Sequence, residues 1–314
     1  MTEVWTQRLK TMADARGACK ICGERADAYA EVIVRGRHPS QLFSCNSCGF
    51  VFIDPVYWLE EAYAAPETSL DVGSVSRNLD VAELLARLLG KVTTRSDLFV
   101  DFGGAHGLLV RLMRDKGYHF HLYEPVAANL FATFCVADQK AFPAYRALTA
   151  IEVFEHLPDP RRSVSEMLEW SRCIIFTTEL CPEERPKPSN WWYFALEEGQ
   201  HVSFFTQKSL QVLAGRLSLS YSSLGGSWHV LAPRGDPISM IEATTLRARS
   251  VSFVGLPLTR FVRCARRAWG GMTRTQQRES LTLRDHVQAS SIVLDQLRGQ
   301  QTARHLDEAM KQAL

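Results

Sequence analysis

Four cysteines near the N-terminus fall into two pairs, and each pair has two residues between its thiols and a glycine after the second. The pairs are Cys19–Cys22 and Cys45–Cys48. Two intervening residues let one turn aim both sulfurs at a single ion, and the glycine permits the positive φ that folds backbone N–H groups toward the sulfurs. Two such turns supply the four thiolates of a structural zinc site, which leaves no open position for catalysis.

The segment between the two pairs contains residues 29–34 and 41–44, which have the pattern of short strands. We therefore expect a zinc ribbon, with disulfides or an iron–sulfur cluster as the alternatives. Eight cysteines in a chain without a recognisable secretory signal indicate reduced thiols. The remaining cysteines stand singly and are expected to be small buried apolar residues: Cys135, Cys173, Cys181 and Cys264.

A glycine-rich turn with an acidic residue 21 positions after its first glycine forms a second chemical motif. Residues 98–107 have the pattern of a strand, a turn and the start of a helix, and the strand predicted at 118–124 ends in Glu124. Glycines let the backbone approach a ligand, and an acid at the tip of the second strand accepts hydrogen bonds from ribose hydroxyls. This βαβ pattern predicts a nucleoside cofactor, without separating a nicotinamide dinucleotide from S-adenosylmethionine.

The form of the turn distinguishes the two cofactors. Asp101 and the glycines at 103 and 107 follow D-x-G-x-x-x-G rather than the G-x-G-x-x-G of dinucleotide sites. This arrangement resembles motif I of class I S-adenosylmethionine-dependent methyltransferases, and the run E-H-L-x-D-P at 155–160 resembles the loop after their fourth strand. From about residue 19 to about residue 224 the chain is similar to methyltransferases with an N-terminal zinc-binding module, including sugar methyltransferases of deoxysugar and surface-polysaccharide pathways.

The resemblance implies a set of cofactor contacts. Glu124 would hold the ribose, Asp138 would hold the adenine amino group, and the methionine end would lie over the turn. The expected contacts are Asp101, Phe102, Gly103, Gly104, Gly107, Glu124, Pro125, Asp138 and Glu152. The chain is shorter than the sugar C-methyltransferases, so the resemblance favours transfer to oxygen or nitrogen and leaves transfer to carbon open.

The loop after the predicted fifth strand carries the candidate catalytic residues. Four adjacent aromatic residues at 191–194 precede Glu198 and His201. Methyl transfer is an in-line displacement that needs close positioning, and a hydroxyl acceptor must also lose its proton to a base such as histidine. We predict His201 as that base with Glu198 orienting it, and His156 as the second candidate. The alternative is that these histidines and aromatic residues only pack the loop.

The elements that must position these residues predict an α/β fold. Helices are expected at 78–93, 108–116 and 165–171, and a further buried strand at 173–178. They suit a doubly wound, Rossmann-like methyltransferase sheet, with a small N-terminal zinc ribbon and a helical C-terminal arm. The expected domains are the ribbon with an N-terminal helix at 1–58, the S-adenosylmethionine-binding domain at 59–244 and the arm at 245–314.

Charge is distributed unevenly along the 314 residues. The net charge is +2, but residues 245–314 hold twelve basic and five acidic residues, a balance of +7. We expect this arm to pack on the core or on a second subunit, with a membrane surface or nucleic acid as the alternative partner. The apolar stretch at 251–271 contains a proline and four arginines, so it is not expected to span a membrane, and a cytoplasmic location is expected.

The function expected from these features is methyl transfer to a small molecule, such as a sugar or nucleotide-sugar hydroxyl in glycan or natural-product biosynthesis. An RNA methyltransferase with a zinc ribbon is the first alternative. Residues 1–60 hold seven basic and seven acidic residues, whereas a phosphate-binding module should be clearly basic. A scaffold that binds the cofactor without turnover is the second alternative.

Overall fold

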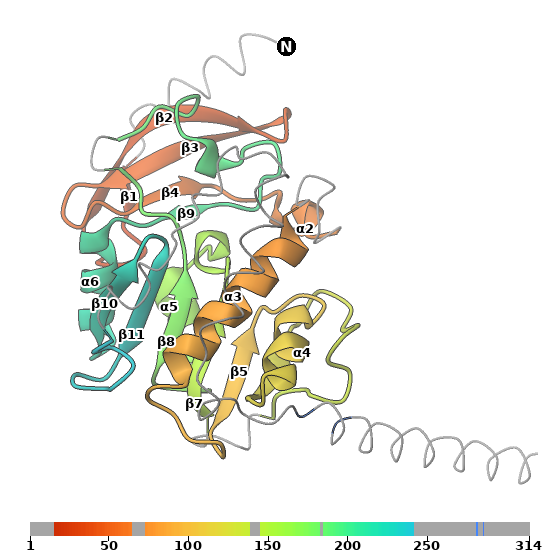
Figure 1. Cartoon of the computed structure of the whole chain (residues 1–314). Helices are drawn as coiled ribbons and strands as arrows, with labels where there is room; N and C mark the ends of the chain where they lie inside the picture. Colours follow the sequence, from red (N-terminus) through yellow and green to blue (C-terminus); the bar gives the residue numbers. More distant parts are fainter. Residues whose placement is uncertain are drawn as a thin grey trace, which may run out of the picture.

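Two β-sheets form the frame of the protein (Figure 1). The computed structural model describes residues 16–64, 73–138, 145–182 and 185–241, together with Leu281 and Asp285. The larger sheet has six strands in the order β10-β11-β8-β7-β5-β6, and the smaller sheet has five in the order β1-β2-β3-β4-β9. Within the described ranges, no helix has the length and apolar character needed to cross a membrane.

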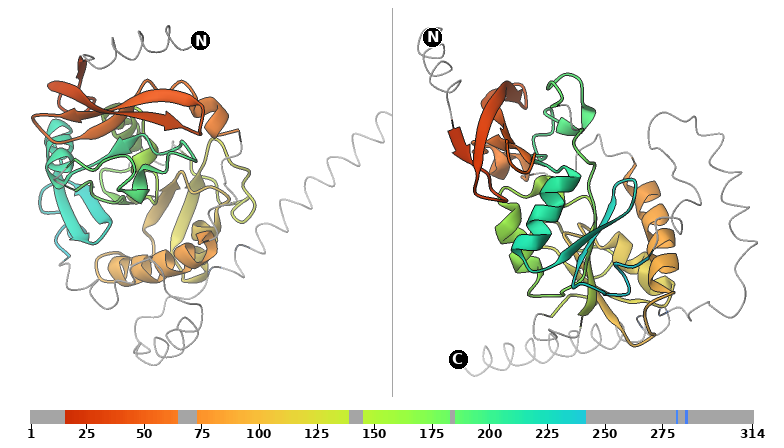
Figure 2. Two further views of the ribbon diagram at one scale, coloured as in Figure 1. Left: turned by 90° about the horizontal axis from the view of Figure 1, so that it is seen from above. Right: turned by 90° about the vertical axis from the view of Figure 1, so that its left-hand side faces the viewer.

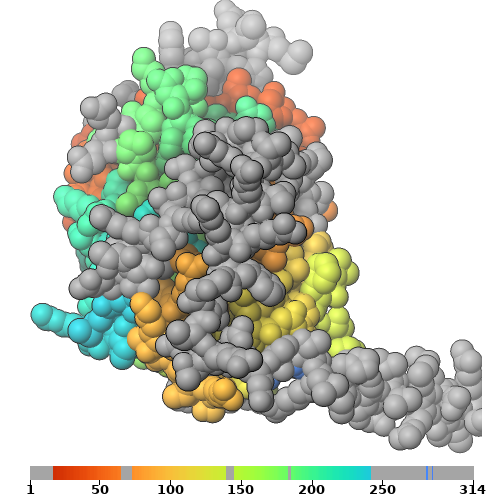
Figure 3. Space-filling view, in the orientation of Figure 1, coloured from red at the N-terminus to blue at the C-terminus, as the bar shows by residue number. Residues whose placement is uncertain are grey.

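The larger sheet is parallel from β6 to β8 and antiparallel at its other edge. Its strands are β5 (Leu98–Phe102), β6 (His119–Tyr123), β7 (Tyr145–Ala150), β8 (Ile174–Thr177), β10 (Ser220–Gly225) and β11 (Trp228–Ala232). Beside β6, Val136 adds only a single parallel bridge to Leu122. The hairpin of β10 and β11 and the helix α4 (Leu108–Asp115) lie at opposite edges of the molecule (Figure 3).

Helices cover both faces of this sheet. The α3 helix (Ser74–Leu89) and α4 pack on the face that holds Phe99 and Phe120, whereas α5 (Pro160–Met167) and α6 (Gln207–Arg216) pack on the opposite face. Successive residues of β5 alternate between the two hydrophobic clusters, as the period of two in a strand requires. The doubly wound α/β fold predicted from the sequence is therefore confirmed.

The smaller sheet is antiparallel and lies against the larger domain (Figure 2). Its strands are β1 (Arg16–Ala18), β2 (Arg25–Val34), β3 (His38–Cys45), β4 (Val51–Asp54) and β9 (Ser203–Phe204). The strand β9 follows β5 to β8 in sequence, yet it belongs to the smaller sheet and pairs with β4 through Val51 and Phe204. The short α2 helix (Leu59–Ala62) leads from this sheet toward the larger domain.

The E-H-L-x-D-P run builds the start of a helix. Phe154–His156 form a single 3-10 turn, η2, and Asp159 then caps α5 by accepting a hydrogen bond from the Arg162 N–H at 3.1 Å. Proline follows at the first helical position, where its missing N–H costs nothing. Part of this sequence signature therefore reflects helix capping, while Glu155 and His156 stay available for chemistry.

The predicted arm, 245–314, lies outside the described residues except at two positions. The Leu281 N–H donates to the carbonyl of Arg114 on α4 at 3.0 Å. The Asp285 carboxylate accepts from Arg114 Nε at 2.7 Å and lies 2.9 Å from Arg111 Nη1. The side chains of Arg114 and Asp285 are only 6% and 9% exposed, so this buried ion pair joins the arm to the cofactor domain.

Candidate metal, cofactor and acceptor sites

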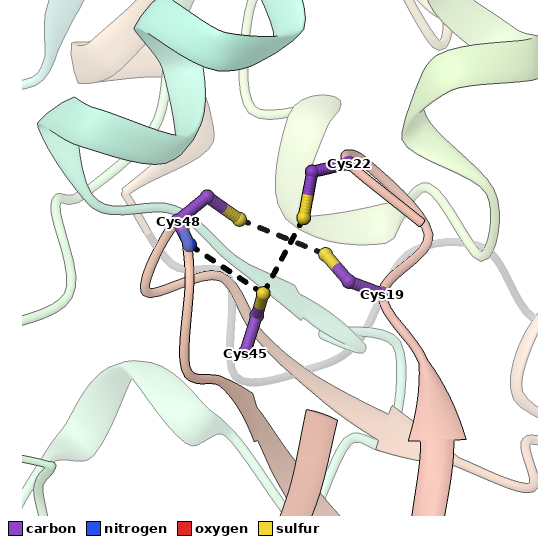
Figure 4. A group of neighbouring side chains, drawn as sticks. All are labelled: Cys19, Cys22, Cys45 and Cys48. Atoms are coloured by element: carbon purple, nitrogen blue, oxygen red, sulfur yellow. Dashed lines mark hydrogen bonds between the residues drawn. The ribbon is translucent and has the colours of Figure 1, made fainter. Parts of the chain in front are cut away.

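The four predicted metal ligands converge in the structure (Figure 4). The Sγ atoms of Cys19 and Cys48 are 3.6 Å apart, and those of Cys22 and Cys45 are 3.4 Å apart. Tetrahedral zinc with four thiolates places its sulfurs roughly 3.8 Å apart, whereas a disulfide would bring two of them to about 2 Å. All four thiols are buried. The set therefore fits a closed zinc centre.

Local backbone geometry supports this donor set. The glycines at 23 and 49 have φ of +81° and +75°, and the Cys48 N–H points to Cys45 Sγ at 3.5 Å. The second turn also contacts α6, because the Thr206 hydroxyl donates to the Cys48 carbonyl at 3.0 Å. The first turn is held by Arg216, which donates to the Cys22 carbonyl at 3.0 Å. The cysteine cluster thus sits between the small sheet and α6.

The glycine-rich turn lies at the carboxyl end of β5, directly above a buried acid. Asp101 is 1% exposed and accepts a hydrogen bond from the Thr149 hydroxyl at 2.6 Å, and burial raises its pKa to about 7. A Cβ at Gly104 would lie 2.3 Å from the Asp101 carboxylate and 2.7 Å from Leu122. The turn can follow this path only because residue 104 has no side chain.

Glu124 reaches the same turn from β6. One carboxylate oxygen accepts from the Ala105 N–H at 3.0 Å, and the other accepts from Val126 and Ala127 at 2.7 and 3.0 Å. A carboxylate has about four lone-pair positions, so one position stays open for a ribose hydroxyl. The structure therefore brings the predicted ribose acid to the predicted turn. The binding role of Glu124 and the roles of the other predicted cofactor contacts stay predictions.

Glu152 lies at the end of β7 on the same edge of the sheet. Its backbone is left-handed, with φ of +54°, which costs a non-glycine residue about 1–3 kcal/mol and is typical of functional sites. Thr177 at the end of β8 holds it, accepting from the Glu152 N–H at 2.8 Å and donating to the carboxylate at 2.7 Å. The adjacent Val153 side chain would lie 3.0 Å from a Cβ at Gly103. The loop after β7 therefore borders the glycine-rich turn.

The two candidate bases lie side by side, although 45 positions separate them in sequence. The rings of His156 and His201 have centroids 5.0 Å apart at an angle of 74°. His201 Nδ1 lies 2.8 Å from the Tyr193 carbonyl, and His156 Nδ1 lies 2.8 Å from the Tyr63 hydroxyl. A carbonyl only accepts, so His201 carries its proton on Nδ1 and a lone pair on Nε2. Burial lowers the pKa of His201 to about 4.

The sequence did not indicate two members of this group. Glu155 is fully buried beside His156, with 4.0 Å between its carboxylate and His156 Nε2. Tyr63 stands before a segment with no recognised motif and contacts His156 through its hydroxyl. The Tyr193 carbonyl orients His201, while the predicted role of Glu198 in orienting that ring stays a prediction.

The aromatic run before His201 mostly packs the loop. Tyr193 and Phe194 are 1% exposed, and Trp191 contacts both Phe194 and Phe204. Trp192 differs, because it is 69% exposed. Three of the four aromatic residues thus hold the loop to the small sheet, as the packing alternative expected.

Comparisons with known proteins identify the larger domain. Residues 76–224 match a family model described as a methyltransferase domain, and this stretch includes the glycine-rich turn and the E-H-L-x-D-P run. The chain therefore carries a class I S-adenosylmethionine-dependent methyltransferase domain and is a methyltransferase with that cofactor. No curated protein matches the sequence.

Solved structures with similar arrangements were also found. The mitomycin 7-O-methyltransferase MmcR is 17% identical, with 56% of this chain and 67% of that chain covered and a TM-score of 0.34. The calicheamicin-biosynthesis methyltransferase CalO1, with S-adenosylhomocysteine bound, is 11% identical, with coverage of 57% and 69% and a TM-score of 0.33. An O-methyltransferase family 2 protein from Planctomyces limnophilus, in complex with apigenin, is 12% identical, with coverage of 55% and 64% and a TM-score of 0.34.

Proposed function

We propose that this S-adenosylmethionine-dependent methyltransferase methylates a hydroxyl of a small molecule, a sugar or nucleotide-sugar, with His201 as the general base. One observation carries the proposal. The Tyr193 carbonyl fixes the proton of His201 on Nδ1 and leaves the lone pair on Nε2, and the ring packs against His156 in the loop after β7 that borders the glycine-rich turn. A base in this tautomer can take a proton from an acceptor without first losing one of its own.

The low pKa of His201 is compatible with this role. Burial keeps the ring neutral at neutral pH, so Nε2 is always ready to accept. An oxygen that is gaining a methyl group becomes a strong acid as the new bond forms. Even a weak base then takes its proton, and fixed positioning supplies most of the rate. His156 packs against His201 and helps to hold it in place.

The cofactor contacts extend this proposal. Glu124 binds the ribose through its remaining lone-pair position, and the backbone from Gly103 to Gly107 lies under the methionine end. Asp138 follows the single bridge at Val136 and binds the adenine amino group. When bound, S-adenosylmethionine supplies the electrophilic methyl group. The chain orients it and removes the acceptor proton.

The four thiolates hold a structural zinc ion under the same proposal. Their separations, their burial and the N–H groups that face them support this role. Zinc then fixes two turns that contact α6 through Thr206 and Arg216. It acts on folding, since four thiolates leave no position for substrate.

The test is product formation from a panel of sugars and nucleotide-sugars, read by mass spectrometry as the gain of one methylene unit. We expect a product with the wild-type chain and roughly 10²–10⁴-fold less with His201→Gln, although both bind S-adenosylmethionine equally in calorimetry. The matched control is His119→Gln, which changes a histidine at the end of β6 that lies away from Glu124 and should retain turnover. Turnover by His201→Gln at the wild-type rate would refute the role of His201 as the base. Methylation of RNA, together with salt-sensitive binding of the chain to RNA, would refute a small molecule as the acceptor.

A further inference from the structure

Glu155, His156 and His201 form a second cluster of metal-ligating side chains. One ligand atom from each residue lies within 4.8 Å of the other two. The residues come from η2 and from the segment just before β9, so the fold brings them together from two loops. Two imidazole nitrogens and one carboxylate oxygen are a ligand set that zinc and similar divalent transition ions prefer.

Hydrogen bonds select one nitrogen of each ring as the ligand atom. His201 gives its Nδ1 proton to the Tyr193 carbonyl, which leaves Nε2 with the lone pair. His156 engages the Tyr63 hydroxyl through Nδ1, and its Nε2 faces Glu155 at 4.0 Å. Histidines that bind metals almost always use their second nitrogen in this way, because the hydrogen bond fixes both tautomer and ring orientation. The His201 ring is therefore prepared for a metal before it arrives, and His156 can take the matching tautomer because the Tyr63 hydroxyl can accept its Nδ1 proton.

The carboxylate of Glu155 provides the independent evidence for a ligand. Glu155 has 0% exposure, and neither of its carboxylate oxygens has a hydrogen-bond partner. The hydroxyls of Tyr193 and Thr178 lie close to it and 3.3 Å from each other, and neither of them carries a compensating charge. Within the described residues, no lysine or arginine forms an ion pair with it. A carboxylate buried in this way is costly unless a cation or proton compensates it.

The spacing suits an ion of the size of zinc. Tetrahedral zinc with nitrogen and oxygen ligands needs ligand atoms roughly 3.4 Å apart. The gap of 4.0 Å between Glu155 and His156 needs only a small side-chain rotation to close. Three protein ligands leave a fourth position free, as in exchangeable sites. His156 retains 21% exposure, so an ion can enter from solvent.

We infer that Glu155, His156 and His201 bind a divalent transition ion of the zinc class, and that this ion blocks methyl transfer by occupying the Nε2 lone pair of His201. The binding is a property of the cluster alone, whereas the block rests on the proposed function of His201 as the base. The ion forms a coordinate bond with the same electron pair that would receive the acceptor proton. The two events therefore exclude each other, and the free metal concentration regulates the enzyme.

Metal content tests the binding without reference to activity. The full chain, loaded with zinc at its cysteines, is incubated with excess Co²⁺, freed of unbound metal and assayed by elemental mass spectrometry. We expect two ions in the wild-type chain and one in Glu155→Gln and His201→Gln. The control Glu179→Gln changes an exposed carboxylate nearby and should retain two. Visible spectra separate the sites, since cobalt bound to thiolates absorbs more strongly than cobalt bound to nitrogen and oxygen.

The outcomes distinguish the binding of the ion from the block of methyl transfer. One ion per wild-type chain, or two in every variant, overturns the site. If Glu155→Gln does not fold, loss of the second ion in His156→Gln gives the same test. Two ions without a fall in product formation, as Zn²⁺ is titrated to full occupancy, overturn the block. Turnover at the wild-type rate in His201→Gln that holds only its cysteine-bound ion overturns the proposed base, while the metal content still decides the binding.

Discussion

The close fit at Gly104 predicts that one added methyl group will disturb the cofactor turn. In Gly104→Ala the new Cβ would lie 2.3 Å from the Asp101 carboxylate and 2.7 Å from Leu122. Asp101 is buried and held by the Thr149 hydroxyl at 2.6 Å, so it cannot swing away without losing that bond. The strain must therefore be borne by the fold or relieved by moving the turn.

The magnitude follows from these two outcomes. Overpacking of a buried position costs about 1–3 kcal/mol. If the fold bears this cost, the melting temperature falls by roughly 2–12 °C, at about 2–4 °C per kcal/mol for a domain of this size. If the turn moves to relieve the strain, the affinity for the cofactor falls by roughly 5- to 150-fold. Thermal unfolding by circular dichroism and calorimetry with S-adenosylmethionine measure both effects.

A second glycine provides the matched control. Gly215 lies within α6, and a Cβ there would meet nothing within 4 Å. Gly215→Ala should therefore stabilise the chain by about 0.5–1 kcal/mol, because alanine loses less entropy in a helix. If Gly104→Ala matched the wild-type chain in both melting temperature and cofactor affinity, the packing of Asp101 beneath the turn would be refuted.

Three further predictions concern the base, the arm and the metal. His201→Gln should lower product formation by roughly 10²–10⁴-fold with unchanged cofactor affinity, and turnover near the wild-type rate would contradict its role as base. The arginines at 111 and 114 lower the pKa of Asp285 in the folded chain. The stability that this carboxylate adds to the fold is therefore complete above its pKa in the unfolded chain, and it is lost as the pH falls through its pKa in the folded chain. The melting temperature should therefore fall more steeply with decreasing pH in the wild-type chain than in Asp285→Asn. This variant should already have lost roughly 3–5 kcal/mol of stability at neutral pH. An equal fall of the melting temperature in both chains would contradict the ion pair. Removal of zinc by a chelator, or Cys45→Ser, should expose the amides of residues 19–48 to hydrogen exchange, and unchanged protection in the metal-free chain would argue against a structural ion.

The sequence could predict the features that depend on local spacing. The paired cysteines, the turn from 103 to 107 and the acid at 124 each follow a short pattern, and the structure places each of them together as expected. The helix α4 and the buried strand β8 follow from hydrophobic periodicity in the same way, whereas α3 and α5 begin at Ser74 and Pro160, before the predicted starts at 78 and 165. Local patterns suffice here because each motif is folded by one turn or one βαβ unit.

Features that depend on distant contacts could not be predicted. Nothing near Val51 indicates that it pairs with Phe204, and nothing in sequence joins Glu155 to His201. Val136, just before the predicted adenine contact Asp138, pairs with β6 through one bridge only. Each of these outcomes is decided by the packing of whole elements, which residue types and spacing do not encode.

A crystal structure with S-adenosylhomocysteine would test the central claim most directly. We expect the ribose hydroxyls at the Glu124 carboxylate, the amino acid end of the ligand over Gly103 to Gly107, and its sulfur directed toward the space beside His201 Nε2. A nucleoside bound elsewhere, with no ribose hydroxyl at Glu124 and the sulfur remote from His201, would contradict the account.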